Sequence, residues 1–247
     1  MFPYIYQSES VTIGTYGVML AIAYLVGRYL YIERLDRNSD SPVNSELLII
    51  ALLVSGVVGA KLMFALKNPD KASLLDFSSL LGGSGFSSQG AILGAILVTL
   101  LFSKLSRVKL STLLDSAAFP AIVAYALARV GCFLAGDDCY GKPSDLPWAM
   151  SFPDGVAKTH ELVHPVPLYE ALYSIAIAFL ILRFEKTKQP PFHTFFVLFI
   201  SWGICRFLVE FVANNPIKII GMSGSQFGAL LMFSFGALFF VYQKAKQ

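Results

Sequence analysis

The sequence predicts an all-helical membrane protein with seven spanning helices. Of its 247 residues, 55% are hydrophobic and 14% are charged, whereas a soluble domain averages about 25% charged residues. The mean hydropathy is +0.64. The apolar residues fall into long runs separated by polar loops. Because lipid offers the backbone no hydrogen bonds, such runs must be helices.

Each predicted span is an apolar run close to the roughly 20 residues that a bilayer requires. The first run has no preceding basic segment and no small-residue cleavage site, so we expect a retained span rather than a signal peptide. We expect one integral membrane domain over residues 1–247. The spans are predicted at residues 11–31, 46–66, 89–102, 111–133, 168–184, 192–211 and 226–242.

The loops predict the orientation. One set of loops carries about twice as many Lys and Arg residues as the other, and the more basic side is normally cytoplasmic. This places the N-terminus outside and the C-terminus in the cytoplasm. The polar loop at about residues 134–167 then faces outward. So does the Gly- and Ser-rich segment 82–90, for which we expect a re-entrant or interfacial conformation, with a flexible connector as the alternative.

Glycine pairs four residues apart are typical of close helix packing. Gly90 and Gly94 form one pair, and Gly224 and Gly228 form another. Packing is the expected role of both pairs. In the fourth run, Asp115 is expected to cap its own helix.

Four cations of the apolar runs are not accounted for by the loops, and a charge within a membrane is a functional candidate by default. They are Arg28, Lys61, Arg129 and Arg206. Arg28 lies close enough to a helix end to reach the interface, and Lys61 could also reach it. Glu210 follows Arg206 by four residues, which places both on one helix face; an ion pair that only neutralises itself is the alternative. Arginine binds phosphate through paired hydrogen bonds. An anionic phospholipid is therefore the expected ligand, either as substrate or as a merely bound lipid.

The stretch after the fourth run gathers reactive residue types. Asp137 and Asp138 are adjacent and are flanked by Cys132 and Cys139, and Gly136 is expected to break the helix between the cysteines. Small buried residues, a disulfide and reactive thiols all remain open for the two cysteines.

Other ligands are less favoured by the sequence. His160 and His164 follow nearby, but their spacing matches no zinc signature. The sequence therefore predicts no metal and no cofactor. The net charge of +3 does not favour nucleic acid as a partner.

Three segments together resemble the bacterial prolipoprotein diacylglyceryl transferase family. They are ARVGCFLAGDDCYGKPSDLPWAMSFP at residues 128–153, HPVPLYE at residues 164–170 and RFLVEF at residues 206–211. The Tyr16-Gly17 pair and Gln226 also match. The resemblance covers nearly the whole chain, and several ordered motifs are more specific than any one.

The resemblance implies a reaction and its partners. The family moves the diacylglyceryl group of phosphatidylglycerol onto the lipobox cysteine thiol of a preprolipoprotein in the bacterial cytoplasmic (inner) membrane. Arg129 and Arg206 would meet the phosphate, and Glu210 would orient Arg206. The implied catalytic residues are Arg129, Arg206, Glu210, Asp138 and His164. The implied substrate-binding residues are Tyr16, Gln89, Cys132, Asp137, Gly141, Tyr169 and Glu170.

This chain also departs from the family pattern. Gln89 stands where the family usually carries a histidine, and Cys132 and Ala135 replace two signature asparagines. The base is therefore left open between Asp138, His164 and Glu210. A related transferase for another lipid or acceptor, and a non-catalytic lipid-binding or lipid-moving protein, remain alternatives.

Overall fold

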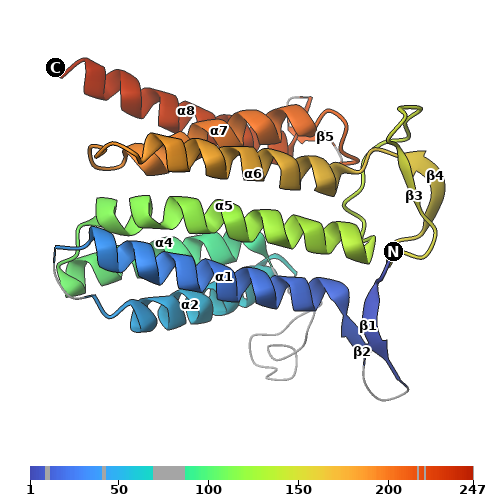
Figure 1. Ribbon diagram of the computed structural model, residues 1–247, viewed down its shortest axis with the longest axis horizontal. Coiled ribbons are helices and arrows are strands. Elements are labelled where there is room, and N and C mark those ends of the chain that lie inside the picture. The colour runs from blue at the N-terminus through green and yellow to red at the C-terminus, as the bar shows by residue number, and fades with distance from the viewer. Residues whose placement is uncertain (9–11, 41–42, 69–86, 216, 220, 247) are drawn as a thin grey trace. The chain divides into compact units, whose positions relative to one another are not determined.

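A computed structural model describes residues 1–8, 12–40, 43–68, 87–215, 217–219 and 221–246. Within these residues it contains seven α-helices and three short antiparallel sheets (Figure 1). The helices are α1 (Thr15–Asn38), α2 (Ser45–Lys67), α4 (Ser88–Ser106), α5 (Leu110–Ala135), α6 (Val166–Phe184), α7 (His193–Val209) and α8 (Gly224–Lys244). The strands pair as β1 (Tyr4–Gln7) with β2 (Thr12–Gly14), β3 (Met150–Phe152) with β4 (Thr159–Val163), and β5 (Ile217–Ile219) with β6 (Met222–Ser223).

The all-helical architecture predicted from the sequence is confirmed. Among the described residues, six helices are long and apolar enough to cross a membrane: α1, α2, α4, α5, α6 and α8. The seventh, α7, has 17 residues. At 1.5 Å per residue it measures about 26 Å, slightly less than a hydrocarbon core of about 30 Å.

Some boundaries differ from those predicted. The first run was expected to be helical from residue 11, but Thr12–Gly14 is a strand and the helix begins at Thr15. The Thr15 N–H donates to the carbonyl of Pro3, the residue before the first strand, at 3.0 Å, which anchors the helix start there. Helix α4 extends beyond its predicted end to Ser106. Most of the predicted re-entrant segment, residues 82–86, lies outside the described residues.

The chain forms two compact units. One combines Met1–Tyr31 with Asp115–Gln247, and the other is Ile32–Leu114. The first unit contains all of α6, α7 and α8, most of α5 and the first part of α1. The second contains α2 and α4.

In the second unit, α2 and α4 approach so closely that only glycine fits at the contact. A Cβ at Gly59 would lie 2.3 Å from the Gly90 carbonyl oxygen, and one at Gly94 would lie 2.3 Å from the Ser55 carbonyl oxygen. Such distances do not allow a side chain. The predicted packing role of Gly90 and Gly94 is confirmed.

In the first unit, α5, α6 and α7 share an apolar core. Helices α7 and α8 come together where a Cβ at Gly203 would lie 2.8 Å from the Ala229 carbonyl oxygen. The packing prediction is wrong for Gly224 and Gly228, because no described atom lies within 4 Å of a Cβ built at either position. The core residues are Ala118, Ile122, Ile177, Ala178, Ile181 and Leu198.

Asp115 caps a different helix from the one predicted. Its carboxylate accepts the Phe192 N–H at 2.7 Å and the Phe195 N–H at 2.9 Å, both at the start of α7. A carboxylate there satisfies exposed N–H groups and favours the positive end of the helix dipole. Asp115 therefore ties α5 to α7.

Candidate functional site

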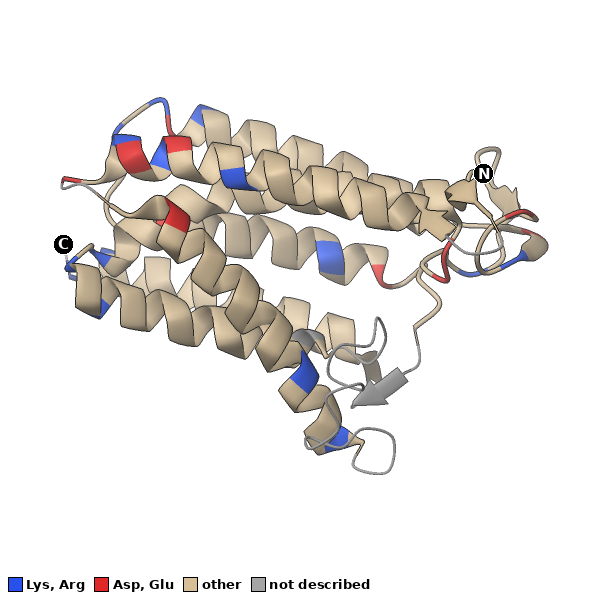
Figure 2. Cartoon of the chain, turned by 90° about the horizontal axis from the view of Figure 1, so that it is seen from below, with Lys and Arg blue, Asp and Glu red and all other residues tan. Residues whose placement is uncertain are grey.

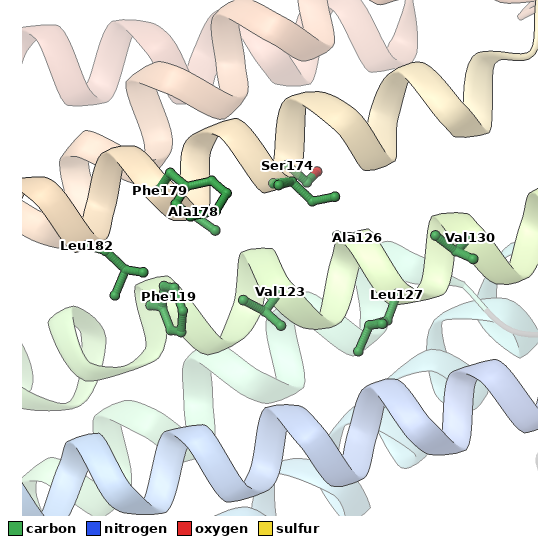
Figure 3. Close-up of a pocket in the computed structure, with 10 residues that line it drawn as sticks. Phe119, Val123, Ala126, Leu127, Val130, Ser174, Ala178, Phe179 and Leu182 are labelled. Atoms are coloured by element: carbon green, nitrogen blue, oxygen red, sulfur yellow. The ribbon is translucent and has the colours of Figure 1, made fainter.

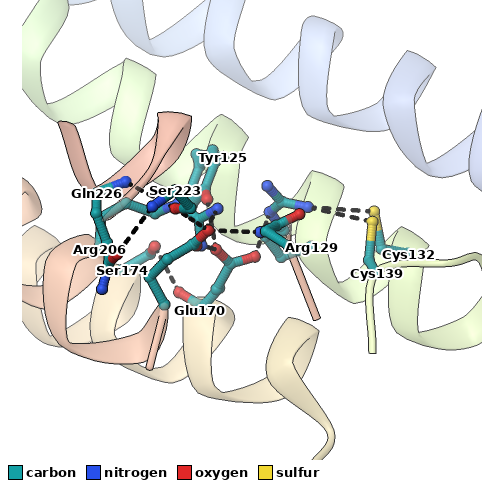
Figure 4. Close-up of polar contacts among 11 residues, drawn as sticks. Tyr125, Arg129, Cys132, Cys139, Glu170, Ser174, Arg206, Ser223 and Gln226 are labelled. Atoms are coloured by element: carbon teal, nitrogen blue, oxygen red, sulfur yellow. Dashed lines mark hydrogen bonds and ion pairs between the residues drawn. The ribbon is translucent and has the colours of Figure 1, made fainter. Parts of the chain in front are cut away.

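Glu170 lies at the centre of the charged cluster in the first unit (Figure 4). It sits near the start of α6, in the second turn, with its side chain 2% exposed. Its Oε2 is 2.7 Å from Nε of Arg129 on α5, and its Oε1 is 2.7 Å from Nη1 of Arg206 on α7. Tyr125 donates its hydroxyl to Oε1 at 3.1 Å. A buried carboxylate is stable only with such partners, so Glu170 fixes the spacing of two guanidinium groups.

Glu210 forms the second ion pair of the cluster. Its Oε2 is 2.8 Å from Nη2 of Arg206, as the four-residue spacing predicts. Its Oε1 accepts from the Ser223 hydroxyl at 2.5 Å and from the Asn215 side-chain amide at 2.7 Å. Ser223 is the N-cap of α8. Arg206 is therefore held between carboxylates on two sides, and this pair is linked to the start of α8.

The other end of Arg129 faces two thiols. Its Nη1 lies 3.7 Å from Cys132 Sγ and 3.6 Å from Cys139 Sγ (Figure 4). Its guanidinium also stacks over the Tyr125 ring, 4.9 Å from the centroid. Arg129 thus links the carboxylate of Glu170 to the thiol pair.

The end of α5 brings the two thiols together. Helix α5 stops at Ala135 because Gly136 adopts a positive φ of 61°, which only glycine adopts without strain. The N–H groups of Gly136 and Asp137 then both reach back to the Cys132 carbonyl, at 3.0 Å and 3.4 Å. The predicted helix break at Gly136 is confirmed.

The cysteines are not joined in a disulfide, so that interpretation is wrong for this structure. Instead, Asp137 Oδ1 accepts the Cys139 N–H at 3.2 Å. The sulfurs of Cys132 and Cys139 and a carboxylate oxygen of Asp137 all lie within 4.8 Å of one another. A hydrogen bond with the Cys132 thiol lowers the pKa of the Cys139 thiol, while burial opposes that shift.

A polar cavity of about 160 Å³ lies beside these groups. Arg129 and Arg206 both line it, although both are also paired with acids. Asp138 and Cys139 line it as well, whereas among the described residues Tyr16, His164 and Tyr169 do not. The full lining is Arg129, Asp138, Cys139, Tyr140, Val166, Glu170, Arg206, Ala213, Asn214, Asn215 and Ser225.

The other predicted site residues of this unit are not part of the ion-pair cluster. His164 Nδ1 is 3.2 Å from the Tyr169 hydroxyl, which also accepts from Trp148 Nε1 at 2.8 Å. Gly141 allows close packing, because a Cβ there would lie 2.2 Å from the Val212 carbonyl oxygen. Tyr16 on α1 lies against Gly131 of α5, with its Cδ2 3.6 Å from the place of a Cβ there.

Gln89 and Lys61 belong to the other unit. Gln89 Oε1 accepts from the Ser87 hydroxyl at 2.8 Å and from Lys67 Nζ at 3.2 Å. Lys61 is buried within α2.

The family model for prolipoprotein diacylglyceryl transferase matches residues 3–242. This chain belongs to the prolipoprotein diacylglyceryl transferase family. It is 28% identical to the phosphatidylglycerol–prolipoprotein diacylglyceryl transferase of Clostridium tetani over 97% of each chain. It is 33% identical to that of Bordetella avium, over 92% of this chain and 88% of the relative. The Campylobacter hominis protein of the same name is 30% identical, over 90% and 83% respectively.

In this member of the diacylglyceryl transferase family, the cluster contains three residues that the sequence did not predict. Tyr125, Asn215 and Ser223 contact the buried carboxylates. Two signals point to them in retrospect. Tyr125 precedes Arg129 by one helical turn, which puts both on one face, and Ser223 opens a Ser-x-x-Gln capping box with Gln226.

Proposed function

We propose that this protein transfers the diacylglyceryl group of phosphatidylglycerol to the cysteine thiol of a prolipoprotein. The observation that carries the proposal is the pair of arginines, Arg129 and Arg206, held apart by Glu170 beside a polar cavity within apolar helices. Relatives of the same family that bear this activity in their names match nearly the whole chain.

The two guanidinium groups form the phosphate site of the proposal. Arginine N–H donors suit phosphate oxygens, and in a water-poor site they stabilise the charge that develops on a leaving phosphate. Glu170 fixes the distance between them, and Glu210 restricts Arg206. We expect the headgroup phosphate to bind between the arginines, on the side that lines the cavity.

A second cavity offers a place for the acyl chains. It has a volume of about 260 Å³ and lies between α5 and α6 (Figure 3). One end is at Val130, the neighbour of Arg129, and at Ser174, one turn after Glu170. The Ser174 hydroxyl donates to the Glu170 carbonyl at 2.6 Å, so the lining stays apolar. A lipid with its phosphate at Arg129 would extend its hydrocarbon into this groove.

Asp138 is the best placed of the three candidate bases. It lines the cavity with both arginines. His164 contacts the Tyr169 hydroxyl, and Glu210 is occupied by Arg206, Asn215 and Ser223. We assign Asp138 the role of accepting the proton of the acceptor thiol.

We also propose the membrane arrangement. All seven helices span, α7 included, within one integral membrane domain of the bacterial cytoplasmic membrane, with the N-terminus outside and the C-terminus in the cytoplasm. The outer polar loop at about residues 134–167 lies at the interface or re-enters it. Lys and Arg residues lie near the C-terminus, at the end of α8 (Figure 2), which favours a cytoplasmic position for that end.

A transfer assay with purified protein tests the function. Phosphatidylglycerol and a lipobox peptide are expected to yield a thioether-linked lipopeptide and glycerol phosphate in equal amounts. Arg129→Ala should lower the rate by on the order of 10²–10³, because the leaving phosphate loses a donor. Arg183→Ala, at the far end of α6, is the matched control and should retain the rate.

The same assay separates the alternatives. Glycerol phosphate release with another acceptor, but not with the peptide, would indicate a related transferase. Phosphatidylglycerol binding without any release would indicate a lipid-binding protein. An Arg129→Ala protein with the full rate would remove Arg129 from the mechanism.

A further inference from the structure

The thiol pair and its neighbouring carboxylate form a group of metal-ligating atoms that the phosphate chemistry does not use. Cys132 Sγ, Cys139 Sγ and a carboxylate oxygen of Asp137 lie within 4.8 Å of one another. In a tetrahedral zinc site the metal–ligand distances are about 2.0–2.3 Å, so bound ligand atoms lie within about 4 Å of one another. Small side-chain rotations would bring the three groups around one ion.

The local fold arranges these ligands. The left-handed Gly136 turns the chain directly after α5, and the Asp137 carboxylate is fixed by its bond to the Cys139 N–H. Cys132 is buried, and Asp137 and Cys139 are half-buried. A Cβ at Gly136 would lie 2.7 Å from Cα of Gly155, so the loop that carries Gly155 supports the turn. The site therefore consists of the end of α5 and a turn that packs against the loop carrying Gly155.

A divalent cation would offset most of the negative charge of this group. Two thiolates and a carboxylate would be too negative for a buried site. The Arg129 guanidinium lies within 3.7 Å of both sulfurs but is shared with Glu170, so a divalent ion supplies most of the compensating positive charge. Thiolate ligands favour zinc over magnesium or calcium.

One of the three proposed ligands borders the polar cavity. Cys139 lines that cavity together with Arg129 and Asp138. Three protein ligands with a fourth position open to a substrate cavity is the arrangement of a reactive zinc site rather than a structural one.

We propose that Cys132, Asp137 and Cys139 bind one zinc-class divalent ion whose fourth position takes the acceptor cysteine as a thiolate. The inference rests on the proposed function for the identity of that acceptor. Metal coordination deprotonates a thiol outright, which supplies the nucleophile that the transfer requires.

The step balances without an oxidant or reductant. The acceptor S–H gives its proton to Asp138 as the sulfur coordinates. The sulfur then attacks the terminal glycerol carbon of the diacylglyceryl group, and a C–S bond forms. The C–O bond to the phosphate breaks, and its electron pair leaves with glycerol phosphate beside Arg129 and Arg206.

Cobalt(II) is the probe for metal binding. The purified full-length protein, kept reduced in detergent, should bind one Co²⁺ by elemental analysis and show thiolate-to-cobalt absorption. Cys132→Ser and Cys139→Ser should each lose most of that absorption. Cys205→Ser, which changes a cysteine packed against the core of α5, α6 and α7, is the matched control and should keep it.

Zn²⁺ protection of wild-type thiols provides a test without substitutions. Zinc should slow maleimide labelling of Cys132 and Cys139 at least tenfold and leave Cys205 unchanged. Absence of Co²⁺ binding to the wild-type protein, its persistence in a Cys132→Ser/Cys139→Ser double variant, or a Cys132–Cys139 disulfide that persists under reductant would overturn the proposal.

The acceptor role has its own readout, independent of turnover. A lipobox peptide should raise the thiolate-to-cobalt absorption about 1.5-fold, because a third sulfur joins two, and the same peptide with serine in place of cysteine should not. An unchanged spectrum with the cysteine peptide overturns the acceptor role. A raised spectrum with no transfer from phosphatidylglycerol supports the metal site while the proposed function fails.

Discussion

Glu170 is the buried carboxylate on which two partly buried arginines depend. Its carboxylate contacts Arg129 and Arg206 at 2.7 Å each, and its side chain is 2% exposed. Removing one partner of a buried ion pair costs about 3–5 kcal/mol, because the remaining charge is left without compensation. A substitution at this position should therefore affect both stability and activity.

We predict that Glu170→Gln lowers the free energy of unfolding by about 3–5 kcal/mol and abolishes transfer. Glutamine keeps the shape of the side chain but leaves Arg206 with Glu210 and deprives Arg129 of the Glu170 carboxylate. Thermal unfolding in detergent measures the first effect and the transfer assay the second. Glu161→Gln, on the exposed part of β4, is the matched control. An unchanged melting temperature in Glu170→Gln would contradict this account of the cluster.

Arg206 bridges two carboxylates through different nitrogens, Nη1 to Glu170 and Nη2 to Glu210. Lysine carries the same charge but cannot present two donors in a fixed fork. We predict that Arg206→Lys lowers the transfer rate roughly tenfold or more, with a smaller effect on stability than Glu170→Gln. The ratio of kcat to KM for phosphatidylglycerol measures the effect. If lysine sustains the full rate, the charge alone is sufficient and the fork geometry is irrelevant.

The charged residues of the cluster could be predicted from the sequence, whereas their neutral partners could not. An arginine or glutamate inside an apolar run stands out because burying a charge is costly. Tyr125, Asn215 and Ser223 carry no such cost, so only the structure reveals that they contact Glu170 and Glu210. The grouping of Cys132, Asp137 and Cys139 was only partly predictable, because the sequence indicates the helix break at Gly136 but not the distances among the three side chains.

At the scale of the elements, the apolar runs predicted the helices because each run is long and almost free of charge. The errors lie where a backbone segment pairs with another part of the chain. The start of α1 was misplaced because β2 pairs with β1. Similarly, Gly141 pairs with Ala213, a contact between distant positions that no local pattern indicates. The Asp115 side chain likewise contacts a distant part of the chain, because it caps α7 rather than its own helix.

The end of α5 yields a prediction about glycine. We predict that Gly136→Ala destabilises the protein by about 1–2 kcal/mol for the left-handed backbone alone, and by more because the new Cβ would lie 2.7 Å from Cα of Gly155. Thermal unfolding measures this, and the transfer rate should fall because Asp138 and Cys139 are displaced.

Gly228→Ala is the matched control for this prediction. Gly228 lies inside α8, and no described atom lies within 4 Å of its added Cβ. Alanine in a helix interior is about 0.5–1 kcal/mol more favourable than glycine, so this variant should be as stable as the wild type or slightly more stable. Equal destabilisation of both variants would indicate a general intolerance of alanine rather than a special turn.

At the scale of the whole molecule, the proposed reaction requires one end of the first unit to face the outer surface. Arg129 lies near the end of α5, Glu170 near the start of α6 and Arg206 near the end of α7. All three helix ends join the polar loop or the segment after α7. The side on which these ends emerge therefore decides whether the site can receive an exported acceptor.

The two ends of α6 are sufficient to test which end of the first unit faces the outer surface. Asp154 precedes it, Lys186 follows it, both are exposed, and the helix has 19 residues. We predict that a membrane-impermeant maleimide applied to intact cells labels Asp154→Cys well above the background of the native cysteines. Lys186→Cys should be labelled only after permeabilisation. The reverse pattern would place the arginine cluster at the cytoplasmic side, where an exported lipoprotein precursor does not present its cysteine, and would rule out the proposed acceptor.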